Sequence, residues 1–91
     1  MIKYEEIKKM TKDALENERA EMKERAIKDL TDGSSYHSIV SAASRGLNAC
    51  TLEFSAKEKT QYLRIMADIL RKEGFVADVR DEERQRIYVS W

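Results

Sequence analysis

Proline is absent from this sequence, glycine occurs at three positions, and there is one cysteine and one histidine. The lone thiol of Cys50 cannot form an intramolecular disulfide, which suits a reducing compartment. No apolar run approaches the roughly 18 residues of a membrane span, and the charged N-terminal stretch lacks the apolar centre of a secretory signal. We therefore expect a cytoplasmic protein that makes no use of a membrane.

An excess of charge of one sign is also missing. Lys and Arg together number 17, as do Asp and Glu, so the net charge is zero. The balance holds locally, with 8 basic and 9 acidic residues in positions 1–33 and 8 and 7 in positions 55–91. Nucleic-acid binding usually requires a basic stripe, so nucleic acid is not an expected partner. A net charge near zero favours association between protein molecules.

What the sequence does contain is a charge-rich first segment. Residues 3–32 hold 17 of the charged side chains and no proline or glycine, which predicts one long helix. Its apolar residues recur at helical spacing in a narrow stripe, which we interpret as a partner or oligomer interface. The stripe consists of Ile7, Met10, Ala14, Met22, Ala26 and Leu30.

The length of this helix suggests self-association. About 28 helical residues span about 42 Å, more than the diameter of about 25–30 Å expected for a domain of this size. Part of the helix must therefore project or break. We expect a homodimer in which the stripe forms a shared seam; the alternative is a kink near Asn17 that yields two short helices folded onto a monomer.

Turn and capping residues divide the rest of the chain. Gly33 is expected in a left-handed conformation, with Ser34 or Ser35 capping a short second helix over residues 35–45. Ser55 and Glu58 have the spacing of a capping box, which predicts that a third helix covers residues 56–73.

Period-two alternation predicts three strands, one before the third helix and two after it. The fold class is α+β: a long N-terminal helix and a short second helix, then β-α-β-β with a three-stranded antiparallel sheet. We favour the strand order 1-3-2 over 1-2-3, because a right-handed crossover leaves room for the last strand between the first two. The chain is expected to be a single domain, residues 1–91, with a charged helical arm over 1–33 and a compact unit over 34–91. The core expected beneath the third helix comprises Phe54, Met66, Ile69, Leu70, Val79 and Val89.

Catalytic signatures are scarce. His37 and Cys50 suggest a dyad only if a third group orients them, and Cys50 falls at an inward strand position that favours an inert thiol. Two such ligands are too few for a structural zinc site, and no spacing typical of calcium or zinc proteins is present. We therefore expect no enzyme activity, no metal and no cofactor.

One segment could bind a small ligand. Asp32 and Gly33 are followed by hydroxyl and aromatic side chains at a helix start, where free backbone donors can meet an anion. The possible contacts are Ser34, Ser35, Tyr36 and His37. Capping of the second helix explains the serines equally simply, and no phosphate-binding glycine motif accompanies them.

The closing stretch ILRKEGFVADVRDEERQRIYVSW combines a helix ending in Glu-Gly-Phe, a strand, a charged turn and a final I-x-V-S-W. It resembles the C-terminal ends of many small proteins encoded by tailed bacteriophages. The resemblance covers about a quarter of the chain and implies a non-catalytic, often oligomeric accessory protein of the host cytoplasm. Our functional hypothesis is binding and inhibition of a host protein, such as a defence protein; the alternative is a small-ligand or nucleotide-binding protein.

Overall fold

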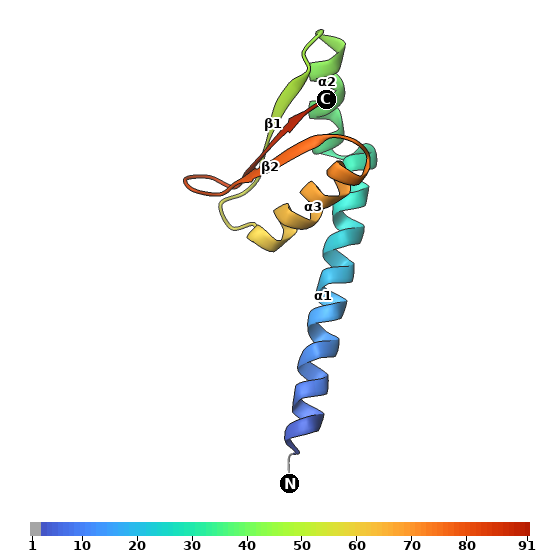
Figure 1. Ribbon diagram of the computed structural model, residues 1–91, viewed down its shortest axis with the longest axis vertical. Helices are drawn as coiled ribbons and strands as arrows, with labels where there is room; N and C mark the ends of the chain where they lie inside the picture. Colours follow the sequence, from blue (N-terminus) through green and yellow to red (C-terminus); the bar gives the residue numbers. More distant parts are fainter. Residues whose placement is uncertain (1–2) are drawn as a thin grey trace.

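Two successive helices form the long dimension of the molecule. In the computed structural model, which describes residues 3–91, α1 covers Tyr4–Asp32 and α2 covers Ser34–Ser44. α2 continues from the end of α1 away from the N-terminus (Figure 1). The molecule measures 63 × 26 × 19 Å, and α1 passes through Asn17 without a break. The alternative of a kink at Asn17 is therefore wrong, and part of α1 projects beyond the body of the protein.

Three antiparallel strands form the sheet. They are β1 (Ala49–Glu53), β2 (Val76–Arg80) and β3 (Arg86–Ser90), in the order β1-β3-β2. β3 pairs antiparallel with both neighbours, so β1 and β2 run in the same direction, with α3 (Thr60–Lys72) as the crossover between them. The α+β class and the split strand order are both confirmed.

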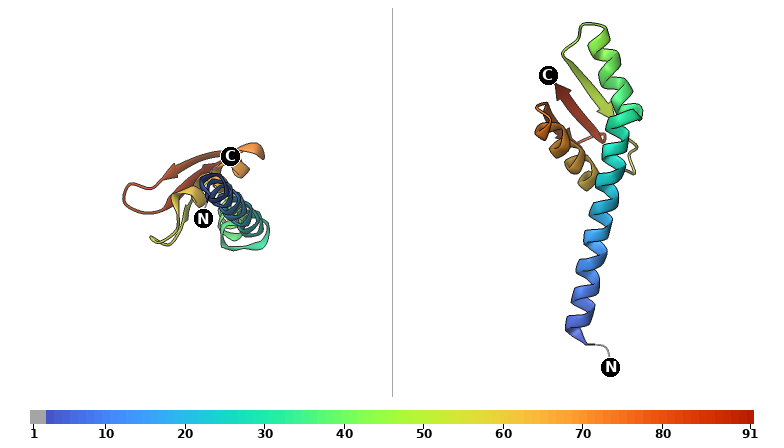
Figure 2. Two further views of the ribbon diagram at one scale, coloured as in Figure 1. Left: turned by 90° about the horizontal axis from the view of Figure 1, so that it is seen from below. Right: turned by 90° about the vertical axis from the view of Figure 1, so that its right-hand side faces the viewer.

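The helices cover one face of the sheet, and the other face is open to solvent (Figure 2). Alternation along the strands sends Leu52, Ile87 and Val89 toward the helices, while Thr51 and Tyr88 point away. The apolar side of α3 fills the space between the layers, with Leu63 and Met66 fully buried. Three of the expected core residues are buried: Met66, Leu70 and Val89. The other three are half-buried and pack against the core: Phe54, Ile69 and Val79.

The start of α3 differs from the expectation. α3 begins at Thr60, four residues after the predicted start, and Ser55 and Glu58 do not form a capping box. The Ser55 hydroxyl accepts a hydrogen bond from the Lys57 amide at 3.2 Å, which closes a turn before the helix. Glu58 instead pairs with Arg25 of α1. A cationic partner offers a carboxylate a stronger hydrogen bond than a neutral backbone amide does, and this partner is visible only in the tertiary structure.

Gly33 also behaves differently from the prediction. Its φ is −87°, an ordinary value, so it does not adopt the left-handed conformation. The glycine is needed for space: a Cβ at this position would lie 2.7 Å from the Cα and 2.9 Å from the carbonyl oxygen of Asp29. The chain can turn from α1 into α2 at this point because residue 33 has no side chain.

The boundary of the compact unit lies within α1 and not at Gly33. Met22 and Ala26 belong to the core, with 8% and 0% of their surface exposed, whereas every residue from 3 to 17 is exposed. We refer to residues 4–17 as the arm and to residues 18–32 as the docked half of α1. The expected 33-residue arm is therefore too long, because its second half packs on α3 and contributes Met22 and Ala26 to the core.

Candidate protein-binding groove and arm

An apolar groove lies where α1, α2 and the C-terminal end of α3 meet. Its volume is about 680 Å³. We call it the groove; its apolar lining comes from all three helices and the start of the last hairpin and includes Ile27, Leu30, Tyr36, Ile39, Val40, Ile69 and Phe75. Lys23, Lys72 and Glu73 contribute the charged part of the lining.

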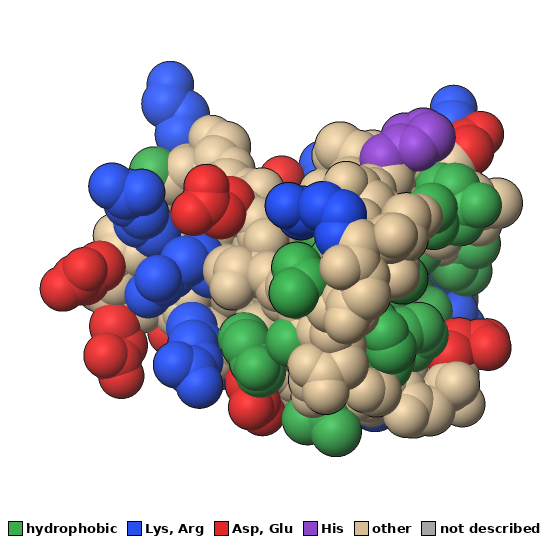
Figure 3. Space-filling model, turned by 90° about the horizontal axis from the view of Figure 1, so that it is seen from above, with side chains coloured by type: hydrophobic (Ala, Val, Ile, Leu, Met, Phe, Trp, Pro, Cys, Tyr) green, Lys and Arg blue, Asp and Glu red, His purple; other side chains and the backbone are tan. Residues whose placement is uncertain are grey.

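Part of the groove belongs to the core and part is open to solvent. Leu30, Ile39, Ile69 and Phe75 pack against buried core residues and form its floor. Ile27, Tyr36 and Val40 retain between 40 and 45% of their surface exposed. Viewed from the α2 end, hydrophobic side chains gather toward the right, while charges of both signs dominate the left (Figure 3). Exposed apolar groups in a concave site are typical of a surface that binds a partner.

Hydrogen bonds between the first residues of α2 and Asp29 of α1 position the α2 wall of the groove. Asp29, in the last turns of α1, accepts hydrogen bonds from the Ser35 amide at 3.2 Å and the Ser35 hydroxyl at 2.5 Å. A carboxylate from one helix thus satisfies donors at the start of the next, where the helix dipole favours negative charge. This contact holds α2 at a defined angle to α1 and so fixes Tyr36 and Val40 beside Leu30.

The arm is the second apolar surface. Tyr4, Ile7, Met10 and Leu15 retain between 46 and 78% of their surface exposed. At about 100° per residue these four side chains and Ala14 fall within about 140° of the helix circumference, and all charges of residues 4–16 lie outside that sector. The arm is therefore a short amphipathic helix whose apolar face is exposed to solvent.

The predicted stripe does not form one continuous seam. Met22 and Ala26 are buried in the protein's own core and Leu30 is half-buried, while Ile7, Met10 and Ala14 are exposed. The physical reason is rotation: 23 residues at about 100° each place Leu30 about 140° around the helix from Ile7. The two halves of the stripe therefore face different directions, and the seam expected from all six residues is wrong for the docked half.

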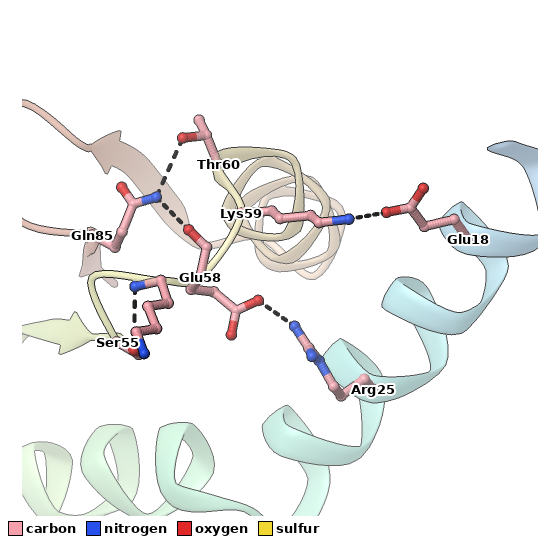
Figure 4. A network of polar contacts seen from close by, with 8 residues as sticks. Glu18, Arg25, Ser55, Glu58, Lys59, Thr60 and Gln85 are labelled. Atoms are coloured by element: carbon pink, nitrogen blue, oxygen red, sulfur yellow. Dashed lines mark hydrogen bonds and ion pairs between the residues drawn. The ribbon is translucent and has the colours of Figure 1, made fainter.

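Ion pairs hold the docked half of α1 against the loop before α3 (Figure 4). Arg25 pairs with Glu58, and its guanidinium lies 4.0 Å from the centre of the Tyr62 ring. Lys59 pairs with Glu18 at the base of the arm. Burial raises the pKa of the Tyr62 hydroxyl, in keeping with its place under α1. These contacts set the direction in which the arm leaves the body.

The same loop is tied to the last hairpin. Gln85 donates a hydrogen bond to the Glu58 carbonyl oxygen at 2.6 Å and a second one to the Thr60 hydroxyl at 3.3 Å. The residue that pairs with α1 is thereby held from the sheet side as well (Figure 4). The arm's direction therefore depends on three parts of the fold: α1, the loop before α3 and the β2–β3 hairpin.

The four residues of the predicted ligand site do not share one environment. Ser35 is buried, and its amide and hydroxyl both bind Asp29, so the protein's own carboxylate occupies the position that an anion would take. The Ser34 hydroxyl also reaches Asp29, at 3.4 Å. Tyr36 and His37 are exposed, with their rings edge to face at a centroid distance of 5.4 Å. Of the four residues, Tyr36 is the one that lines the groove.

His37 and Cys50 line the same shallow hollow between α2 and β1. Burial raises the pKa of the half-buried Cys50 thiol, which keeps it protonated and weakens it as a nucleophile. No hydrogen bond joins the two side chains within the part of the chain that the structure describes. The geometry thus gives the proposed dyad no activated nucleophile.

Residues 3–91 contain neither a metal-binding cluster nor a membrane-spanning helix. Within that range no three His, Cys, Asp or Glu residues are grouped so that they could hold a metal ion. None of the helices there is long and apolar enough to span a membrane.

The fold and the site define a class of architecture: a two-layer α+β body with an apolar groove and a projecting amphipathic helix. Comparison with protein-family models, curated proteins and solved structures finds no match.

Sequence reasoning missed most of the groove. Ile27, Val40 and Phe75 all lie outside the stripe that the sequence predicts as an interface. A signal was present in the sequence on either side of Gly33, where α1 and α2 carry more apolar residues than a single buried face of each helix requires. The additional apolar residues are Ile27, Ile39 and Val40.

Proposed function

We propose that this protein is a non-catalytic interaction protein that binds another protein by accepting an amphipathic helix into the groove. One observation carries the proposal. Ile27, Tyr36 and Val40 are exposed around a floor of half-buried apolar residues, in a concave site between three helices. A hydrophobic groove between helices is a recurring binding site for the apolar face of a helix.

The lining of the groove defines the chemistry of the partner. The partner helix needs apolar side chains at spacings of three, four and seven residues to reach the floor. Two of the three charged lining residues, Lys23 and Lys72, are basic. Acidic residues beside the apolar face of the partner helix would therefore raise the association rate and help to set its orientation.

The resemblance of the last quarter of the chain to bacteriophage accessory proteins supports a bacterial host protein as the partner. In that proposal, occupation of the groove by a helix of the host protein inhibits that protein. The small-ligand alternative has less support, because Asp29 already uses the amide and hydroxyl of Ser35.

Capture from bacterial lysate followed by mass spectrometry tests the proposal. The wild type is compared with Val40→Glu, which introduces a charge into the exposed wall of the groove. Val76→Glu is the matched control, because Val76 is 57% exposed and lies on the open face of the sheet. We expect a protein that is retained by the wild type and the control and lost from Val40→Glu. Equal capture by all three would overturn the groove as the binding site.

A further inference from the structure

The two edges of the sheet differ in how their backbone groups are used. β1 and β2 are the outer strands, because β3 lies between them. An edge strand presents every second amide and carbonyl group to its outer side, where another chain can pair with them. Proteins commonly cover or block such an edge, so an edge that stays open requires an explanation.

Hydrogen bonds at both ends of β1 show which of its backbone groups face outward. At one end the Phe54 amide donates to the Gln85 carbonyl oxygen at 2.9 Å. At the other end the Trp91 amide donates to the Asn48 carbonyl oxygen, also at 2.9 Å. The even-numbered residues of β1 therefore bond to β3, and the odd-numbered ones face away from it. The outward amide and carbonyl groups belong to Ala49, Thr51 and Glu53.

The edge of β2 is closed by a side chain. The same alternation directs the Ala77 carbonyl away from β3, and the Arg71 guanidinium of α3 donates to it through Nε at 2.9 Å and Nη2 at 2.6 Å. Ala77 is only 1% exposed. Within residues 3–91, no side chain donates in this way to a carbonyl of β1. The outward groups of Thr51 and Glu53 are therefore open to solvent, and both residues are exposed.

The shallow hollow between α2 and β1 follows this open edge. Its volume is about 550 Å³, and Ala49 and Thr51 line it from the strand. A chain that paired with β1 would direct every second side chain toward α2, on the same side of the sheet as Cys50. The side chains of α2 that line the hollow are His37, Ser38 and Ser41, and Arg45 follows at the end of the helix.

The charge beside the hollow has one sign. Arg45 is the only Lys, Arg, Asp or Glu among residues 33–52, in a chain of which 37% is charged. Its side chain is exposed, and its Nε donates to the Ser41 carbonyl oxygen at 3.4 Å. No Asp or Glu within residues 3–91 forms an ion pair with it. A carboxylate is therefore the group that complements this site.

We propose that β1 binds an extended segment of a partner protein as a fourth strand, with an Asp or Glu side chain of that segment paired to Arg45. Strand addition derives its affinity from main-chain hydrogen bonds and its specificity from pockets for alternate side chains. The acidic residue belongs opposite Cys50, because side chains at that position point toward α2. This edge is separate from the groove, so the proposal goes beyond helix binding.

A second copy of β1 does not fit this place. α2 lies over β1 and contacts it, and it makes no contact with β3 within the described chain. A second β1 would bring its own α2 to the same side of the sheet. Paired strands lie about 4.8 Å apart, whereas packed helices need about 8–10 Å between their axes. The two α2 helices would therefore collide, and an extended segment without such a helix avoids the collision.

Selection from a displayed library of random nine-residue peptides on the wild-type protein tests the proposal. We expect a class of acidic peptides whose affinity falls by about tenfold or more in Thr51→Pro, which removes an outward amide and breaks no bond to β3. Thr51→Val is the matched control, because it keeps the amide, and should bind within about twofold of wild type. Val40→Glu should bind this class normally. If every selected peptide ignored Thr51→Pro, strand addition would be overturned; peptides lost only in Val40→Glu would then support the groove alone.

Two measurements with a selected peptide complete the test. Wild type should prefer the acidic peptide to a form with Gln in place of the acid by about tenfold, and Arg45→Gln should bind both forms equally. Hydrogen exchange of the Thr51 and Glu53 amides, followed by NMR on wild type, should slow when the peptide binds. This second measurement decides the matter even if Thr51→Pro fails to fold. Unchanged exchange would overturn the proposal, as would exchange that slows with protein concentration alone, which would indicate a second copy at this edge.

Discussion

The arm and the docked half of α1 are two parts of one helix with opposite roles. Both are rich in charge, and both carry apolar residues at helical spacing. Met22 and Ala26 in the docked half are buried in the core, whereas Ile7, Met10 and Ala14 in the arm face solvent. The difference shows that an apolar stripe on a helix indicates burial only where a second surface lies within reach.

Substitution of one alanine in each half of α1 should give the largest difference in the free energy of unfolding. Ala26→Glu places a carboxylate at a position with no exposed surface, and an uncompensated buried charge costs about 3–5 kcal/mol. Ala14→Glu lies in the exposed arm and should change the free energy of unfolding by less than about 0.5 kcal/mol. Urea unfolding, measured by circular dichroism at low protein concentration, compares the two. Similar unfolding midpoints would contradict the division of α1 at residue 17.

Substitution of one methionine in each half of α1 compares the stability of the two halves without adding a charge. Met22→Ala removes a buried side chain and should lower the free energy of unfolding by about 2 kcal/mol or more. Met10→Ala removes an exposed one and should leave it nearly unchanged. Chemical unfolding of both variants decides the point. If Met22→Ala were as stable as wild type, Met22 would be part of an interface between molecules, as the stripe alone suggested.

Substitution of one aspartate in each half of α1 distinguishes a helix-capping role from the effect of a surface charge. Asp29→Ala removes the acceptor of the Ser35 hydrogen bonds and should cost about 1–2 kcal/mol, as loss of a helix cap does. Asp13→Ala in the arm should have little effect on stability, because Asp13 is exposed. Thermal unfolding of both variants measures the difference. Equal melting temperatures would show that Asp29 does not hold α2 in place.

The two arginines of the docked half should differ least in their effect on stability. Arg25→Ala removes an ion pair with Glu58 and the contact with the Tyr62 ring, at a cost of about 1 kcal/mol because the Arg25 side chain is half exposed. Arg19→Ala should be close to neutral. The loss at Arg25 should shrink in high salt, which screens the ion pair. A loss independent of salt would assign the effect to packing on Tyr62.

Alternation and helical spacing determined the order and type of the helices and strands, the α+β class and part of the core from the sequence alone. These patterns reflect local geometry, in which period two and period 3.6 place side chains on opposite faces of a strand or on one face of a helix. The strand order followed from one further physical rule, the handedness of the crossover. All of this depends on residues close together in the sequence or on general chirality.

Only the tertiary structure decided which residues met across the chain. Glu58 paired with Arg25 and not with its own helix start, and Asp29 capped α2 from within α1. The division of α1 into an arm and a docked half depended on where α3 begins, beside Glu18, which no residue of α1 encodes. The groove arose in the same way, from three helices that converge at Gly33. Contacts between distant segments depend on packing in three dimensions, and the spacing of residues along one helix carries no record of them.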